Sequence, residues 1–209
     1  MKRFLCFFLF TLFVATPILA HQPVMVGKTT EEIRDPTISR AFYDELAGQP
    51  RSYFINAGKA FDLYLNLLVP KNTNAGGRYS ARVYRLSDGW RQLLTNVRAD
   101  SVEWREFYEP FGGDTYLKGP EFKRNVQAGK YEIEVYNVGN RGKYVLVVGE
   151  KEFFGPKEIA QVYVALPLLK ASFFGTSPFQ FLITPFGIVL VVILIFVAAF
   201  GYFLFRRRH

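Results

Sequence analysis

Apolar and polar residues alternate along several segments in the middle of the chain, which is the pattern of half-buried β-strands. In residues 61–69, FDLYLNLLV, every second residue from Phe61 to Leu67 is apolar. Residues 130–136 alternate in the same way, and residues 144–148 are continuously apolar, as in a central strand covered on both faces. These segments predict a domain built mainly from strands.

Turn-forming residues separate the strand-like segments. Residues 137–142, NVGNRG, predict an antiparallel hairpin between the strands on either side of them. Asp88-Gly89 predicts a second, tight hairpin. Weaker strand signals lie at residues 53–57, 102–108 and 122–127. Seven or eight short strands with regularly spaced turns predict an antiparallel β-sandwich of jelly-roll or Greek-key type.

Two segments with helical spacing flank the predicted strands. Residues 36–46 carry apolar side chains four residues apart and end before Gly48, so we expect a short helix there. A second, amphipathic helix is expected over residues 156–170, with Ile159, Val162, Tyr163 and Leu166 on one stripe. Such a stripe either packs on the parent domain, which is the usual fate of an apolar helix face, or contacts a partner.

The longest apolar segment of the sequence is at its C-terminal end. Residues 186–205 carry no charge, and a helix of 20 residues spans about 30 Å, the hydrocarbon thickness of a bilayer. Thr184 and Pro185 suit the cap and first turn of that helix, and three arginines follow it. The sequence predicts a transmembrane anchor over residues 182–205 with a cytoplasmic tail at 206–209.

The first 20 residues have the features of a secretory signal. Lys2 and Arg3 precede an apolar run over residues 4–14, and Pro17 and Ala20 follow it. We expect cleavage after Ala20; the alternative is an uncleaved signal anchor. The chain after the signal would then start outside the cytoplasm, and the C-terminal arginines would lie inside, as the positive-inside rule favours. The predicted location is the cell membrane, crossed once.

The expected organisation is therefore a signal peptide (1–20), an N-terminal segment with a short helix (21–50), a β-sandwich ectodomain (51–150), a juxtamembrane amphipathic helix and interfacial segment (151–181) and the anchor. Phe173, Phe174 and Phe179 favour the membrane interface, so we expect the domain to lie close to the bilayer.

Composition narrows the function classes. Of the net charge of +8, the residues Lys2, Arg3 and the three terminal arginines supply +5, and the other charges are interspersed, so we expect no nucleic-acid binding. The single cysteine, Cys6, lies in the signal, which excludes disulfides and thiol catalysis in the domain. The two histidines are His21, at the expected mature N-terminus, and His209, across the membrane, so neither lies inside the domain for a Ser-His-Asp triad and the two cannot share a copper site. We predict a non-enzyme with no cofactor and no metal.

The most unusual internal stretch is residues 107–121, FYEPFGGDTYLKGPE, which is dense in aromatic residues, Gly and Pro. Such a loop serves as a ligand rim, because Gly allows close backbone approach and aromatic rings supply rigid contact area. Alternatives are a Ca²⁺ site and an ordered loop whose aromatics plug one end of the sandwich. The candidate binding residues are Tyr108, Glu109, Phe111, Asp114, Tyr116 and Glu121. A further interpretation is a sugar-stacking surface formed by Trp90, Trp104, Tyr108, Phe111 and Tyr116.

Two resemblances support the architecture. Residues 126–136, VQAGKYEIEVY, and 140–149, NRGKYVLVVG, resemble the closing strands of bacterial pre-peptidase C-terminal domains, which are secreted β-sandwiches. The whole layout is similar to uncharacterised prokaryotic membrane-anchored ectodomain proteins that begin near Ala-His-Gln-Pro and contain Tyr-Glu-Pro-Phe-Gly-Gly. The resemblance implies a fold and a topology, and no catalytic residue.

The function predicted from the sequence is a membrane-anchored, non-catalytic binding or assembly module with a protein or glycan partner on the extracytoplasmic side. The alternative is an accessory subunit of a membrane complex that acts through the 156–170 helix and the span.

Overall fold

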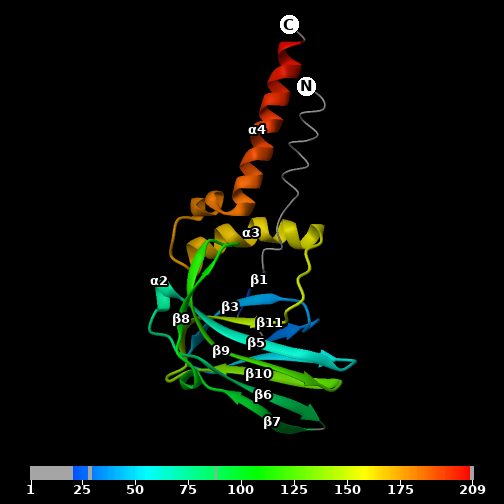
Figure 1. Cartoon of the computed structure of the whole chain (residues 1–209), viewed down its shortest axis with the longest axis vertical. Helices are drawn as coiled ribbons and strands as arrows, with labels where there is room; N and C mark the ends of the chain where they lie inside the picture. The colour runs from blue at the N-terminus through cyan, green and yellow to red at the C-terminus, as the bar shows by residue number, and fades with distance from the viewer. Residues whose placement is uncertain (1–20, 28–29, 88, 208–209) are drawn as a thin grey trace.

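The computed structural model describes residues 21–27, 30–87 and 89–207, so the predicted signal peptide lies outside the described residues. The strands form two sheets packed face to face, which confirms the predicted sandwich (Figure 1). The six-stranded sheet has the order β1 (Gln22–Met25), β3 (Arg40–Ala47), β11 (Arg141–Val148), β5 (Phe61–Pro70), β9 (Asp114–Val126) and β8 (Arg105–Glu109). The five-stranded sheet has the order β2 (Glu31–Ile33), β4 (Arg51–Ala57), β10 (Gly129–Tyr136), β6 (Ser80–Ser87) and β7 (Trp90–Val97). Neighbouring strands are antiparallel except for the pairs β1–β3 and β2–β4.

Alternate residues of the strands point into the core between the sheets, as the period-2 pattern predicts. Leu63, Leu65 and Leu67 of β5 are fully buried there, opposite Val83 of β6 and Ile133 of β10. Strand β11 is covered on both faces, because its even-numbered residues enter this core and its odd-numbered ones lie beneath a helix. The prediction of a central strand at residues 144–148 is therefore confirmed.

The helix predicted at residues 36–46 is wrong, because the segment from Arg40 forms strand β3. The error has a simple origin: apolar residues four positions apart share a face of a strand as well as of a helix. Phe42 and Leu46 both point into the core between the sheets, and β3 pairs with β1 and β11.

The hairpin predicted across residues 137–142 is also wrong. Strands β10 and β11 belong to different sheets, so the turn between them carries the chain from one sheet to the other. The turn chemistry is as predicted, with Asn140 at φ 47° and bonded to Asn137. The hairpin predicted at Asp88-Gly89 is confirmed, because β6 and β7 pair antiparallel.

Helices cover the outer face of the six-stranded sheet. Besides the short α2 (Lys71–Asn74) and η1 (Ala99–Ser101), the chain forms α3 (Pro156–Ser172), η2 (Pro178–Ile183) and α4 (Pro185–Arg206). Leu169 of α3 and Phe174 pack on Val145 and Val147 of β11. The layers therefore follow the order α4, α3 with η2, six-stranded sheet, five-stranded sheet (Figure 1).

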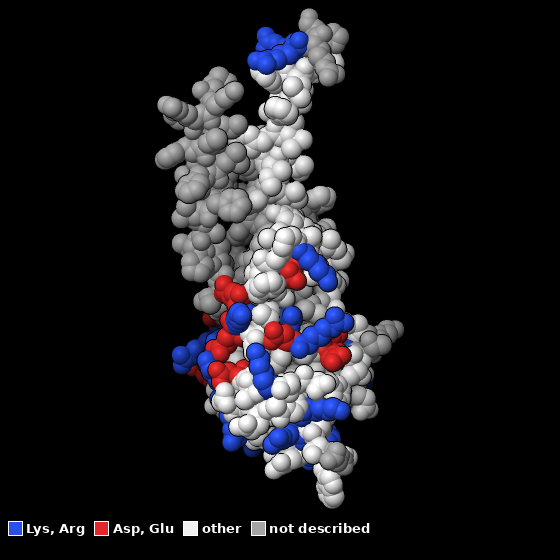
Figure 2. All heavy atoms as spheres, turned by 90° about the vertical axis from the view of Figure 1, so that its right-hand side faces the viewer, with Lys and Arg blue, Asp and Glu red and all other residues white. Residues whose placement is uncertain are grey.

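Helix α4 is long and apolar enough to cross a membrane, in agreement with the predicted span. Thr184 caps it, with Oγ1 accepting the N–H of Gly187 at 3.3 Å. Figure 2 shows the surface of α4 free of charged side chains up to the basic residues at its end.

Candidate functional site

The stretch predicted as a binding loop forms the end of a β-hairpin. Strands β8 and β9 pair antiparallel from Arg105–Lys118 to Glu109–Asp114, and residues 110–113 make the turn. Gly113 has φ +70°, a conformation that suits glycine, and its N–H donates to the Glu109 carbonyl at 2.9 Å. The hairpin end reaches α3 and the start of α4 (Figure 1).

The Glu109 carboxylate organises the turn of this hairpin. It is 7% exposed and accepts the backbone N–H groups of Phe111 at 2.8 Å and Gly112 at 2.7 Å. Burial raises the pKa of Glu109, and the two backbone hydrogen bonds oppose that rise. The side chain of Glu109 is therefore committed to the turn.

A buried ion pair joins the hairpin to α3. Lys170 Nζ lies 2.7 Å from Asp114 Oδ1, and the two side chains are 2% and 8% exposed. The same ammonium donates to the Gly113 carbonyl at 3.4 Å. Burial raises the pKa of Asp114, whereas the charge of Lys170 lowers it. A charged pair held this far from water fixes how α3 lies on the hairpin.

Aromatic contacts complete this junction. The Phe111 ring lies 4.4 Å from the ring of Phe186, in the first turn of α4. The Tyr116 hydroxyl is 3.0 Å from that of Tyr43, and its ring meets Phe174 edge-on at 5.7 Å. Phe111 and Tyr116 are 7% and 1% exposed. The hairpin therefore ties the β-sandwich to both α3 and α4.

The structure brings four of the six predicted binding residues together, and these four are buried in the junction: Glu109, Phe111, Asp114 and Tyr116. Tyr108 is 61% exposed at the hairpin. Glu121 lies further along β9, where it pairs with Lys118 at 3.0 Å. Binding through the two exposed residues stays a prediction. In the described part of the chain, no three His, Cys, Asp or Glu side chains are grouped to hold a metal ion.

The aromatic residues considered for sugar stacking lie in different places. Trp90 is 80% exposed on β7, in the five-stranded sheet, and Tyr108 is exposed on β8, in the other sheet. Trp104 is partly buried and donates from Nε1 to the Ala99 carbonyl at 2.9 Å. With Phe111 and Tyr116 inside the junction, these five rings do not form one surface.

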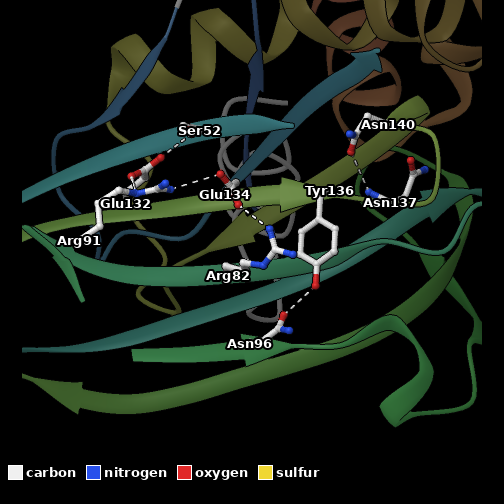
Figure 3. A network of polar contacts seen from close by, with 9 residues as sticks. All are labelled: Ser52, Arg82, Arg91, Asn96, Glu132, Glu134, Tyr136, Asn137 and Asn140. Atoms are coloured by element: carbon white, nitrogen blue, oxygen red, sulfur yellow. Dashed lines mark hydrogen bonds and ion pairs between the residues drawn. The ribbon is translucent and has the colours of Figure 1, made fainter. Parts of the chain in front are cut away.

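The outer face of the five-stranded sheet carries a polar network from four adjacent strands, drawn in Figure 3. Arg91 on β7 binds two carboxylates of β10, with Nε 2.9 Å from Glu132 and Nη2 3.2 Å from Glu134. Arg82 on β6 binds the other oxygen of Glu134 at 2.9 Å. Ser52 on β4 donates to Glu132 at 2.6 Å. The network fixes the positions of both guanidinium groups.

Each guanidinium of this outer face also lies over an aromatic ring. Arg82 Cζ is 4.0 Å from the centroid of the Tyr136 ring, and Arg91 Cζ is 3.9 Å from that of Tyr84. The Tyr136 hydroxyl donates to Asn96 at 2.9 Å. These contacts hold long arginine side chains in one conformation, so little entropy remains to be lost on binding.

Within this network the cations are more exposed than the anions. The arginine side chains 82 and 91 are 37% and 46% exposed, whereas those of Glu134 and Glu132 are 15% and 9% exposed. Beside them, Leu93 on the edge strand β7, paired with Tyr84, is 53% exposed. Among the charged residues visible at the end of the domain farthest from α4, Lys and Arg prevail (Figure 2).

The sequence carries a partial signal for this surface. Glu132 and Glu134 alternate with core residues, as do Arg82 and Tyr84, so each pair is predicted to point outward. That the two pairs lie side by side depends on the pairing of β10 with β6, which no local pattern in the sequence indicates.

Comparisons with known proteins leave the family open. No family model matches the chain, and no curated protein matches it. A similar structure is the pre-peptidase C-terminal domain of a collagenase from Bacillus anthracis, at 16% identity and a TM-score of 0.39, covering 59% of this chain and 96% of that one. Another is CorA, a surface-associated copper-binding protein of Methylomicrobium album BG8, at 7% identity and a TM-score of 0.28, covering 61% and 98%. A β-glucosidase from Paenibacillus barengoltzii matches at 10% identity and a TM-score of 0.25, covering 65% and 14%.

A pre-peptidase C-terminal domain is thus among the similar structures, as the resemblance of the closing strands suggested. All three TM-scores are low, so these likenesses carry no conclusion about function.

Proposed function

We propose that this protein is a membrane-anchored, non-catalytic binding module on the extracytoplasmic side, and that the outer face of its five-stranded sheet contacts an acidic protein partner. The order of the layers carries the proposal, because this face lies on the side of the domain opposite α4 (Figure 1). With α4 across the bilayer, the outer face points away from the membrane and is accessible to a protein partner.

The junction supports this role because it fixes the orientation of the domain relative to α3 and α4. The Lys170–Asp114 pair and the Phe111–Phe186 contact tie the hairpin to α3 and α4. A domain held in this way keeps one face directed away from the bilayer. The same contacts explain why the hairpin itself offers little free surface.

The chemistry of the outer face favours an acidic protein. The exposed charges of its network are the guanidinium groups of Arg82 and Arg91, which match carboxylates in bidentate geometry. Tyr and Arg are among the residue types that contribute most at protein interfaces. Leu93 adds apolar contact next to the charges. A ligand with carboxylates flanking apolar groups fits this surface.

The direction of insertion is part of the proposal. The signal-like residues 1–20 and the arginines after residue 205 support a domain outside the cytoplasm and a short tail within it.

The proposal is tested by capture from solubilised native membranes with the full-length tagged chain. The test variant combines Arg91→Gln and Leu93→Ser on the outer face. The control combines Val138→Ser and Arg105→Gln, which change an exposed apolar residue and an exposed arginine elsewhere. We expect the wild type and the control to retain the same protein partner and the test variant to lose it.

Salt gives a second readout, because ion pairing at an exposed surface weakens as the Debye length falls from about 10 Å at 0.1 M to about 3 Å at 1 M. Capture should therefore fall at high salt. A partner retained by the test variant at high salt would refute the outer face as the contact surface and favour assembly through α3 and α4. Capture of a glycan in place of a protein would refute the partner class.

A further inference from the structure

We propose that the outer face of α3, together with η2, lies in the interfacial layer of the bilayer, so that the domain rests on the membrane through a second, non-spanning contact. The outer face of α3 is the side turned away from the sheets. From Ala160 onward its exposed residues are Ala160, Val164, Leu168 and Ala171, with Gln161 at the flank and Lys157 one turn earlier; Val164 and Leu168 are 63% and 51% exposed.

The arrangement of apolar residues on α3 is unusual for a helix in water. One side packs on the sandwich and the hairpin through Val162, Leu166 and Leu169. A helix that covers a water-soluble domain normally carries charged residues on the other side. Here the other side is apolar from Val164 to Ala171, and the single charge on it, Lys157, lies in the first turn, so the apolar part has no favourable contact in water.

The segment from α3 to α4 is almost free of charged residues. From Ile159 to Phe205 the sequence holds a single charged residue, Lys170, and that side chain is 2% exposed because it pairs with Asp114. Every exposed side chain between Ile159 and Phe205 is therefore uncharged, whereas Lys157 in the first turn of α3 and Arg206 at the end of α4 are exposed. This is the composition of a surface in contact with lipid, where an exposed charge is costly.

Position identifies lipid as the occupant. α3 lies across the N-terminal end of α4, on the side of the domain from which α4 extends (Figure 1). With α4 across the bilayer, α3 runs along the membrane surface, where apolar helix faces enter the boundary between headgroups and acyl chains by about 5–10 Å. Phe179 and Ile183 of η2, 76% and 79% exposed, extend the same surface to the start of α4.

This contact differs from the interfacial segment expected from the sequence. Phe173 and Phe174 were expected at the membrane, but they are 7% and 2% exposed and pack on the six-stranded sheet. The membrane contact is made instead by the outer face of α3. The way α3 packs on the sandwich determines which side of the helix remains exposed.

The inference is tested by spin labelling of the full-length chain with Cys6 changed to Ser. Single variants Val164→Cys, Leu168→Cys and Leu93→Cys each carry a nitroxide, and the protein is reconstituted in discs of phosphatidylcholine and phosphatidylglycerol. Leu93 is the matched control, because it is an equally exposed leucine on the outer face of the five-stranded sheet.

We expect the labels at 164 and 168 to collide more often with oxygen, which concentrates in lipid, than with a water-soluble nickel chelate. The label at 93 should show the reverse order. The reverse order at all three positions would overturn the inference, since the face would be in water. Labels at 164 and 168 shielded from both reagents would also overturn it, because a second copy of the chain would then cover α3. Neither outcome depends on whether the outer face of the five-stranded sheet binds a partner.

Discussion

The buried Lys170–Asp114 pair gives the sharpest prediction for the junction, because removing both partners should destabilise the fold by clearly less than the sum of the two single removals. At the observed 2.7 Å, two unit charges attract by about 6 kcal/mol at an effective dielectric constant of about 20. Desolvation of the two charges cancels most of that attraction. Loss of one partner leaves the other buried and unpaired, at a cost of about 3–5 kcal/mol.

The test is a double-mutant cycle with Lys170→Met, Asp114→Asn and the double variant. The free energy of unfolding is measured by urea titration of the full-length protein in detergent micelles, followed by circular dichroism. We expect each single variant to lose about 3–5 kcal/mol and the double variant to lose at least about 2 kcal/mol less than the sum of the two. Arg105→Gln, at an ion pair whose side chains are 80% and 78% exposed, should change nothing measurable.

The loss in Lys170→Met should also depend on pH. Without the ammonium, burial alone acts on Asp114 and holds its folded-state pKa above the unfolded value. Stability linked to a raised pKa is fully present below the unfolded pKa and is lost as the pH rises through the folded one. The variant should therefore be closest to the wild type near pH 4 and furthest from it at neutral pH. Additivity of the two single variants within about 0.5 kcal/mol would refute the reasoning.

Three further predictions use the same unfolding assay or limited proteolysis. Burial, aided by the charge of Lys118, lowers the pKa of His21 from 6.5 to about 4. The free energy of unfolding of the wild type should therefore fall by up to about 3 kcal/mol as the pH falls from 6.5 to 4, and that of His21→Gln should fall by less. Identical pH profiles of the two proteins would contradict this. Phe111→Ala should cost about 3 kcal/mol by opening a cavity in the junction, whereas an unchanged stability would show that the ring does not anchor the hairpin. Gly187→Ala should speed protease cleavage in residues 173–184, because a Cβ at position 187 would meet the backbone of η2. Gly201→Ala is the control, since the space around position 201 is open, and it should be cleaved at the rate of the wild type.

The β-sandwich was predictable because its strands alternate strictly. Segments such as residues 61–69 and 130–136 have few other ways to bury every second residue. Strand β3 was missed because its apolar residues, Phe42 and Leu46 among them, satisfy both a helical and a strand period. Its true partners, β1 and β11, are distant in sequence or weakly patterned, and pairing with them decides the structure.

The surfaces were harder to predict than the fold. Residues 107–121 look like a binding loop by composition, and burial of Phe111 and Tyr116 depends on where α3 and α4 pack. The outer face of the five-stranded sheet depends on three strand pairings, and only β6–β7, predicted from Asp88-Gly89, is visible in a local pattern. Local periodicity tells which residues point the same way, and only the tertiary structure tells which strands share a surface.

The central claim, that the outer face of the five-stranded sheet contacts the partner, is tested most directly by site-specific photocrosslinking in intact cells. A photoreactive residue replaces Leu93 on this face, Tyr108 on the β8–β9 hairpin or Val138 in the β10–β11 turn, all of which are exposed. The account predicts a discrete crosslinked protein from position 93 and none from the other two. A crosslink from position 108 with none from position 93 would contradict it and return the contact surface to the hairpin.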